Sequence, residues 1–111
     1  MYSATVTTSN ASGGAQTSNI IALDPFMSQF QVSIACVVTG TANYTAQLTL
    51  DNIQADGYNP ATGNWFTVTG LGTQTTTQLV ALNQPVMGVR LVQNSGSGSV
   101  AMTVLQTGAG N

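Results

Sequence analysis

Only four side chains in this 111-residue sequence carry a charge, and they limit the chemistry that the protein can perform. Two of them, Asp51 and Asp56, flank a loop, and a facing pair of carboxylates is the equipment of a glycosidase. Aspartates in such loops more commonly accept hydrogen bonds from nearby backbone, and we favour this turn role for both. General acid–base catalysis draws mostly on His, Glu, Asp or Lys, and the sequence contains no His, Glu or Lys. We therefore predict that the protein is not an enzyme and has no catalytic residues.

The same loop offers oxygen atoms suited to a calcium ion. Asp51, Asn52, Asp56 and Asn59 follow one another closely, and calcium takes six to eight oxygen ligands. Their spacing matches no established calcium-loop pattern. We therefore favour a solvated turn and expect no metal and no other cofactor.

The single cysteine, Cys36, falls in the apolar phase of a predicted strand. A catalytic thiol needs a base beside it, and the sequence has no His to supply one. No second cysteine is present for an intramolecular disulfide. We therefore expect Cys36 to be a small buried hydrophobic residue.

Four residues are candidates for an interface: Tyr58, Trp65, Arg90 and Val92. Trp65 and its neighbour Phe66 must point to opposite faces of a strand, so we expect one core residue and one contact residue. Stacking of Trp65 and Tyr58 on a sugar is the alternative. The only cation, Arg90, lies mid-strand, and its guanidinium can pair with a carboxylate or carbonyl across an interface. Its expected partner is Asp24, Asp51 or Asp56, and an inert, solvated arginine is the alternative.

The surface composition predicts association with other protein chains. Charged residues make up 4% of the sequence and the net charge is -2, so electrostatic repulsion between copies is weak. One cation cannot form a phosphate-binding surface or a basic membrane-surface helix. The longest apolar run, Ile34–Val38, is too short to span a bilayer, and the first residues lack the pattern of a signal peptide. We expect a homo-oligomer, most simply a trimer, that binds neither nucleic acid nor membrane.

Alternation of apolar and polar residues predicts an all-β fold. The pattern over Gln29–Leu50, with a break at Gly40, indicates an antiparallel hairpin, and Val86–Gln93 with Ser99–Gln106 indicates a second one. We predict an antiparallel β-sandwich or jelly-roll-like barrel of about eight strands. Residues 1–111 form one domain, with an N-terminal arm and loop over 1–18 and a flexible tail over 107–111. The other predicted strands are Tyr2–Thr8, Asn19–Leu23, Trp65–Thr69 and Thr75–Leu82.

The predicted core consists of the apolar residues in the inward phase of both hairpins. They are Phe30, Val32, Ile34, Cys36, Val38, Tyr44, Ala46, Leu48, Leu50, Val89, Leu91, Val100, Met102 and Val104. Both phases of the last hairpin are largely apolar, so its second face needs a cover, which another subunit can supply.

Several motifs follow one another between Ile20 and Gln106. They are an apolar run ending in Asp-Pro-Phe, a Thr-Gly-Thr turn leading into a Tyr-Thr-x-Gln strand, a Trp-containing strand, a Val-Arg-Leu run and a Gly-Ser-rich closing run. In this sequence these are Ile21–Phe26 with Phe30 and Val32, Thr39–Thr41 with Tyr44–Asp51, Trp65–Phe66, Val86–Leu91 and Gly96–Gln106. In these motifs the sequence resembles a group of small virion proteins of tailed bacteriophages.

The resemblance implies a β-sandwich or jelly-roll-like domain, often trimeric, that decorates or cements a phage head. The implied partner is the major capsid protein, and the implied location is the capsid surface of the virion after synthesis in the host cytoplasm. It implies no catalytic residues. Another virion role, in the tail, adaptor or head-fibre base, and a carbohydrate-binding β-sandwich module remain alternatives.

Overall fold

The computed structural model describes residues 2–9, 14–23, 31–53, 55–59, 62–82 and 86–107. Strands and their connections account for this part of the chain, which confirms the all-β prediction. It contains nine strands, one more than the approximate number expected. They are β1 (Tyr2–Ser9), β2 (Gln16–Thr17), β3 (Ile21–Ala22), β4 (Gln31–Thr39), β5 (Asn43–Thr49), β6 (Trp65–Thr67), β7 (Gln78–Leu82), β8 (Gly88–Ser95) and β9 (Ser99–Thr107).

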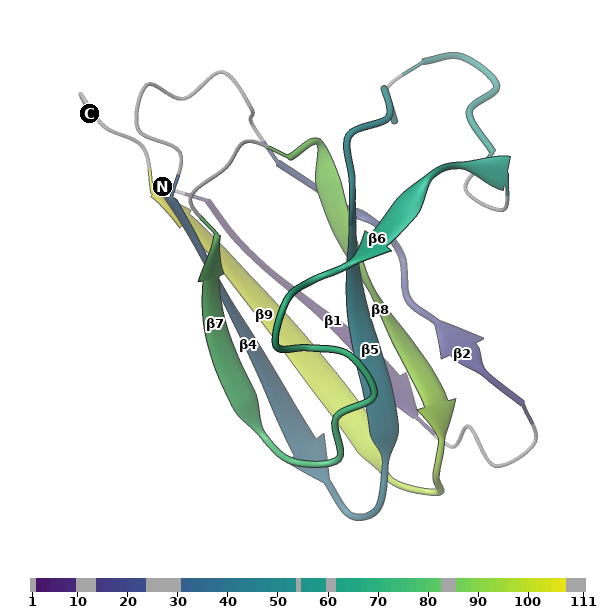
Figure 1. Cartoon of the computed structure of the whole chain (residues 1–111), viewed down its shortest axis with the longest axis vertical. Helices are drawn as coiled ribbons and strands as arrows, with labels where there is room; N and C mark the ends of the chain where they lie inside the picture. The colour runs from purple at the N-terminus through teal and green to yellow at the C-terminus, as the bar shows by residue number, and fades with distance from the viewer. Residues whose placement is uncertain are drawn as a thin grey trace.

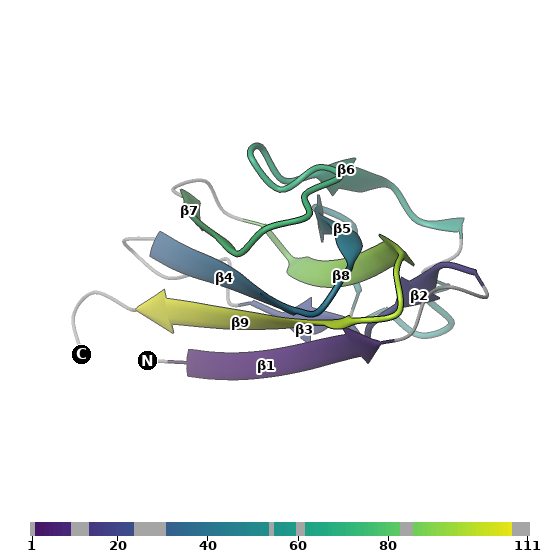
Figure 2. The same cartoon turned by 90° about the horizontal axis from the view of Figure 1, so that it is seen from below.

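The strands form two antiparallel sheets that pack face to face (Figures 1 and 2). Sheet 1 has the order β1-β9-β4-β7, and sheet 2 has the order β2-β8-β5-β6, with β3 also pairing with β8. Part of the pairing is nested along the chain, from its two ends toward its middle. Strand β1 pairs with β9, β2 and β3 pair with β8, β4 pairs with β7, and β5 pairs with β6. This winding is that of a jelly roll, one of the two architectures that the sequence predicts.

Neither predicted hairpin forms as a pair of hydrogen-bonded neighbours. The strands β4 and β5 lie in different sheets, and so do β8 and β9. The chain therefore crosses from one sheet to the other at each Gly-containing break. The period of two predicted correctly that each strand buries one face, but two strands facing each other across a sandwich show the same pattern as a hairpin.

The two crossings form a pair of stacked arches at one end of the sandwich, at the bottom of Figure 1. Strand β4 pairs with β9 in sheet 1 and β5 pairs with β8 in sheet 2, so the connections lie side by side. The amide of Gly98 in the second arch donates to the carbonyl of Thr41 in the first at 2.7 Å. A Cβ on Gly98 would lie 2.7 Å from the Thr41 nitrogen, so only glycine permits this approach.

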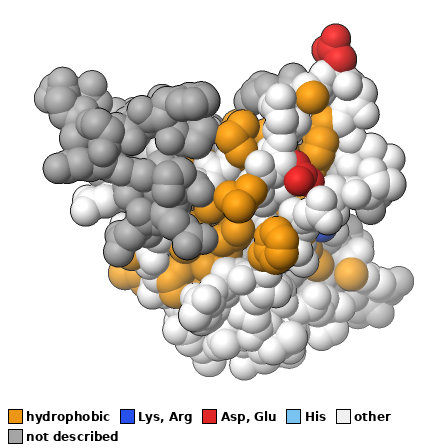
Figure 3. All heavy atoms as spheres, turned by 45° about the horizontal axis from the view of Figure 1, so that its top comes forward, with side chains coloured by type: hydrophobic (Ala, Val, Ile, Leu, Met, Phe, Trp, Pro, Cys, Tyr) orange, Lys and Arg blue, Asp and Glu red, His pale blue; other side chains and the backbone are white. Residues whose placement is uncertain are grey.

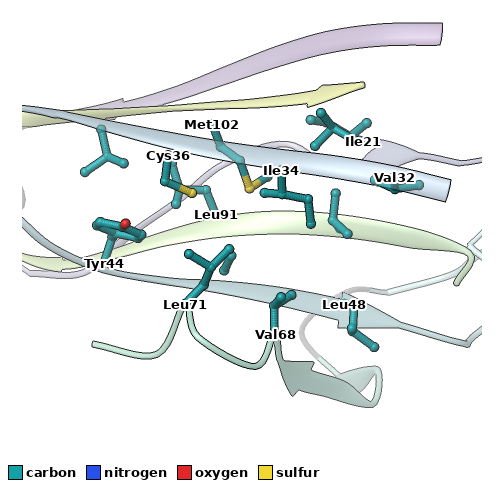
Figure 4. Packing of buried hydrophobic residues seen from close by; sticks show 14 of the residues in the cluster. Ile21, Val32, Ile34, Cys36, Tyr44, Leu48, Val68, Leu71, Leu91 and Met102 are labelled. Carbon is teal, nitrogen blue, oxygen red and sulfur yellow. The ribbon is translucent and has the colours of Figure 1, made fainter. Parts of the chain in front are cut away.

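The core lies between the two sheets, and side chains from both meet there (Figure 4). Of the predicted core, eleven residues are buried and Val38 packs against them partly buried, whereas Phe30 lies outside the described residues. The prediction is wrong for Leu50, which is 60% exposed because β5 ends at Thr49. Buried residues that the sequence did not single out are Ile21, Leu23, Ala42, Val68, Leu71 and Val86.

The N-terminal stretch forms an edge strand, as predicted for Tyr2–Thr8. Strand β1 pairs with β9 over its whole length, from Tyr2 opposite Gln106 to Ser9 opposite Ser99, and so forms one edge of sheet 1. In the region predicted as a loop, Gln16–Thr17 forms the short strand β2 against β8. Thr107 closes β9, and the rest of the predicted tail, 108–111, lies outside the described residues.

Two groups in the core carry strongly raised pKa values. Burial raises the pKa of the Cys36 thiol from 9.0 to about 12. Burial, and secondarily the nearby Cys36, raises the pKa of the Tyr44 hydroxyl from 10.0 to about 12. That hydroxyl donates to the carbonyl of Thr76 at 2.8 Å. Neither group is poised for chemistry at neutral pH, and the prediction of a buried Cys36 is confirmed.

These two groups predict a loss of stability in alkali. Between about pH 9 and pH 12 the unfolded chain releases protons that the folded chain retains, so the free energy of unfolding falls as pH rises. Urea unfolding should show the full free energy below about pH 9 and a decline above it. In a Cys36→Ala, Tyr44→Phe double variant the decline should be shallower. An equal slope in the variant would show that neither group causes it.

Candidate functional site

Arg90 projects from the outer face of sheet 2 and is held there on two sides. Its Nε donates to Oε1 of Gln47, the residue directly opposite on β5, at 2.8 Å. Its guanidinium carbon lies 4.1 Å from the centroid of the Trp65 ring on β6. Partial burial lowers the pKa of Arg90, and the nearby Tyr58 acts in the opposite sense. The guanidinium is therefore fixed in one orientation by an amide and an aromatic ring.

Of the other residues predicted as an interface, Trp65 contacts Arg90, Tyr58 lies near it and Val92 shares its face of β8. Arg90 and Val92 are two positions apart on β8 and so point the same way. Val92 lies half-buried between Thr45 of β5 and Thr17 of β2, opposite both in the sheet. We call Gln47, Tyr58, Trp65, Arg90 and Val92 the Arg90 face. Gln47 is the member that the sequence did not reveal, because only the β5–β8 register brings it to Arg90.

Asp51 accepts hydrogen bonds within the loop beside this face. Its Oδ2 accepts a hydrogen bond from the backbone nitrogen of Asn64 at 2.7 Å and lies 3.5 Å from the hydroxyl of Tyr58, which donates to it. The carboxylate thus ties the two ends of the loop together, which confirms the turn role predicted for Asp51. Among the described residues, Arg90 contacts Gln47 and Trp65, whereas Asp24, one of its three candidate carboxylate partners, lies outside the described residues.

Asp56 lies exposed on a turn of the same loop, five residues further along the chain. Across the described residues, no group of three or more His, Cys, Asp or Glu side chains could hold a metal ion. The predicted oxygen-rich loop contains Asp51, Asn52, Asp56 and Asn59. Its Asp51 carboxylate accepts a backbone hydrogen bond, and its Asp56 side chain is exposed.

The outer face of β5 is partly covered by its own chain. Thr45 and Thr49 point outward, yet both are buried. Thr49 donates to the carbonyl of Asn64 at 2.9 Å, and Thr45 accepts from the backbone nitrogen of Thr73 at 3.0 Å. The two segments that follow β5 therefore cover part of its outer face.

A groove opens between β6 and β7 at the end of the sandwich opposite the arches. Its volume is about 650 Å³, and apolar side chains from both sheets line it, among them Leu48, Phe66 and Leu82. Phe66 lies opposite Leu48 in the register, on the side of sheet 2 that faces sheet 1, and is 56% exposed at the groove. Trp65 points to the outer face of sheet 2 and is half-buried against Arg90. Figure 3, turned toward this end of the molecule, shows hydrophobic side chains gathered in the middle of the surface.

The described residues contain no helix that is long and apolar enough to cross a membrane. No protein-family model matches the chain, and no curated protein matches it significantly.

Proposed function

We propose that the protein is a structural component of a phage virion that binds the outside of the capsid and stabilises it. The observation that carries this proposal is the uncharged surface. Of the charged residues, Asp51 ties a loop, Asp56 lies on a turn and Arg90 is held by Gln47 and Trp65. The rest of the described surface consists of hydroxyl, amide and apolar groups, which suits lasting burial against other protein surfaces.

The jelly-roll winding supports the proposal by analogy. This fold occurs in viral capsid domains, and also in lectins and cupins, so the winding does not select among them. The chemistry of the surface must therefore distinguish among these functions. Cupin-type chemistry needs metal-binding side chains, and no cluster of them occurs among the described residues.

Stabilisation would work by clamping. Each subunit lays amide-rich and apolar surface across the joints between capsid proteins, so that the shell cannot relax without breaking those contacts. Each contact is weak, but many identical copies act together, and their effects multiply. The Arg90 face is the surface that we assign to neighbouring subunits, because Arg90 and Trp65 are residue types that anchor interfaces.

A carbohydrate-binding role is the alternative from another class. Such a site would offer the faces of Trp65 and Tyr58 to a sugar ring. The Arg90 guanidinium stacks on the Trp65 ring, so one face of that ring is already in use. This arrangement favours the structural proposal, and binding of the isolated chain on a glycan array would favour the alternative.

We expect Val92→Asp to dissociate the proposed trimer and to weaken capsid binding. The substitution would place a carboxylate among apolar and hydroxyl groups of an interface, where an unpaired charge costs several kcal/mol, about 3 as an order of magnitude. Sedimentation velocity gives the oligomeric state, and co-sedimentation with capsids that lack the protein gives the binding.

Ser97→Asp is the matched control, because Ser97 is exposed on the second arch, away from Arg90. It adds the same charge and should change neither measurement. If wild-type chain does not sediment with capsids at all, the proposed function is wrong. If both variants bind like wild type, the Arg90 face is not the contact surface.

A further inference from the structure

The outer face of sheet 1 has the composition of an interface. Every described residue that points outward from β1, β9, β4 and β7 is uncharged. Leu79 is 72% exposed, Val37 is 49% exposed and Leu105 is 37% exposed, so three of the five large exposed hydrophobic residues lie here. No other element of the described chain covers them. We call this surface the sheet 1 face.

The apolar residues of the sheet 1 face lie together on β9, β4 and the edge strand β7. The register places them in three successive rows: Leu105 with Ala81, Ala35 with Leu79, and Ala101 with Val37. Serines and threonines form a polar rim beside them on the other edge strand, β1. Apolar residues bordered by a polar rim are also found in specific protein–protein interfaces.

Two hydroxyl groups beside the apolar residues already have a hydrogen-bond partner. The hydroxyls of Thr5 on β1 and Thr103 on β9 lie 3.0 Å apart and hydrogen-bond each other. Hydroxyls that already have a partner lose less on leaving water than free ones do. The edge strand β1 is long and regular and carries no lysine, proline or bulge, the usual features that keep an edge from associating.

The rows are also self-complementary. A two-fold axis that runs across the strands through the row of Ala35 and Leu79 reverses the order of the rows on a second copy. Leu105 then meets Ala101 of that copy, Val37 meets Ser33, and Leu79 meets Leu79. In the two outer rows a large side chain opposes a small one, on the axis two leucines meet, and no charge needs a counterpart. The rotation of about 30° that is usual between packed sheets leaves the residues near the axis opposed.

We propose that two copies of this chain pack face to face through the sheet 1 face about such an axis. Strand spacings of about 4.8 Å and rises of about 3.4 Å per residue give about 500 Å² of face per copy. The pair would bury about 1,000 Å² in total, near the lower limit for a specific interface. The contact is separate from the Arg90 face, so it stands whether or not the protein binds a capsid.

The test is the mass of the purified full chain by sedimentation equilibrium at concentrations up to about 100 µM, where micromolar contacts are populated. Wild type should contain an even number of chains: six if the Arg90 face also forms trimers, and two if it does not. Leu79→Asp should halve that mass and weaken the association by at least about 100-fold, because it brings two carboxylates together on the axis. Leu50→Asp is the matched control, since Leu50 is 60% exposed just after β5 of sheet 2, and it should leave the mass unchanged.

A mixing experiment tests the axis itself. Leu79→Asp and Leu79→Lys chains should each fail to pair alone, yet an equimolar mixture should restore the wild-type mass, since the axis places position 79 opposite itself. Far-ultraviolet circular dichroism confirms that each variant is folded, and Val37→Asp replaces any variant that is not. An odd-numbered wild type, an unchanged mass for Leu79→Asp, or a mixture that does not recombine would each overturn the proposal. So would a Leu79→Asp chain of unchanged mass that no longer binds capsids, because the face would then belong to the capsid.

Discussion

Gly98→Ala should lower the free energy of unfolding by about 3 kcal/mol, a large share of the roughly 5–15 kcal/mol typical of a domain. The added Cβ would run into the carbonyl oxygen of Thr39 and come within 2.7 Å of the Thr41 nitrogen. Both are backbone atoms of the neighbouring arch, so no side chain can rotate away. The hydrogen bond from the Gly98 amide to the Thr41 carbonyl would be lost as the arches separate.

Gly57→Ala is the control for that substitution. Gly57 has a φ of +74°, but a Cβ there would meet nothing within 4 Å. The control should cost only about 1 kcal/mol, the price of the left-handed backbone for alanine. Chemical denaturation of both variants measures the difference. Equal costs at Gly57 and Gly98 would show that the stacking of the arches contributes nothing to stability.

Gln93→Leu should also destabilise the fold by about 3 kcal/mol, although leucine is apolar and of similar size. Gln93 lies fully buried beside the second arch. Its Oε1 accepts from the hydroxyl of Thr8 at 3.0 Å, and its Nε2 donates to the carbonyls of Gly98 at 3.0 Å and Gly96 at 3.2 Å. Leucine would leave these three groups without their partner in a place that water reaches poorly.

The matched control for Gln93 is Gln16→Leu, an exposed glutamine on β2, the strand that pairs with β8. That variant should unfold within about 0.5 kcal/mol of wild type. Thermal and urea unfolding of the two variants give the comparison. A Gln93→Leu chain as stable as wild type would mean that the buried amide is dispensable and that the arch is held by its backbone alone.

The sequence predicted the burial of side chains better than the pairing of strands. Alternation in β4 and β5 identified Ile34, Cys36, Tyr44 and Ala46 as core residues, because period two depends only on one face being buried. It could not show that β4 and β5 face each other across the core, since a turn in one sheet and a crossing between sheets leave the same local pattern.

A pattern based on hydrophobicity could not identify the polar residues of the core. Gln93 and Gln106 occupy inward positions and are fully buried. Their burial depends on partners that the fold supplies, such as Thr8 from the far end of the chain. Val68 and Leu71 were missed for a related reason. They lie after β6 in an irregular segment that bonds to Ala46 through its backbone and shows no alternation.

The sequence could show that two of the candidate interface residues share a face, but it could not show how the others are placed. The phase of β8 already places Arg90 and Val92 on one face. That Trp65 lies beneath Arg90 depends on β6 pairing with β5 and β5 with β8, which are contacts between distant parts of the sequence. The same long-range pairing brings Asn64 to Asp51 and Gln47 to Arg90.

The central claim is that the protein clamps a capsid, and the temperature at which the capsid releases its genome tests this most directly. Capsids that lack the protein are heated alone or with purified chain added to saturation, and a dye reports DNA as it becomes accessible. Saturating chain should raise the release temperature, and the rise should level off once a fixed number of copies is bound per capsid. A release temperature that stays the same at full occupancy would contradict the clamp.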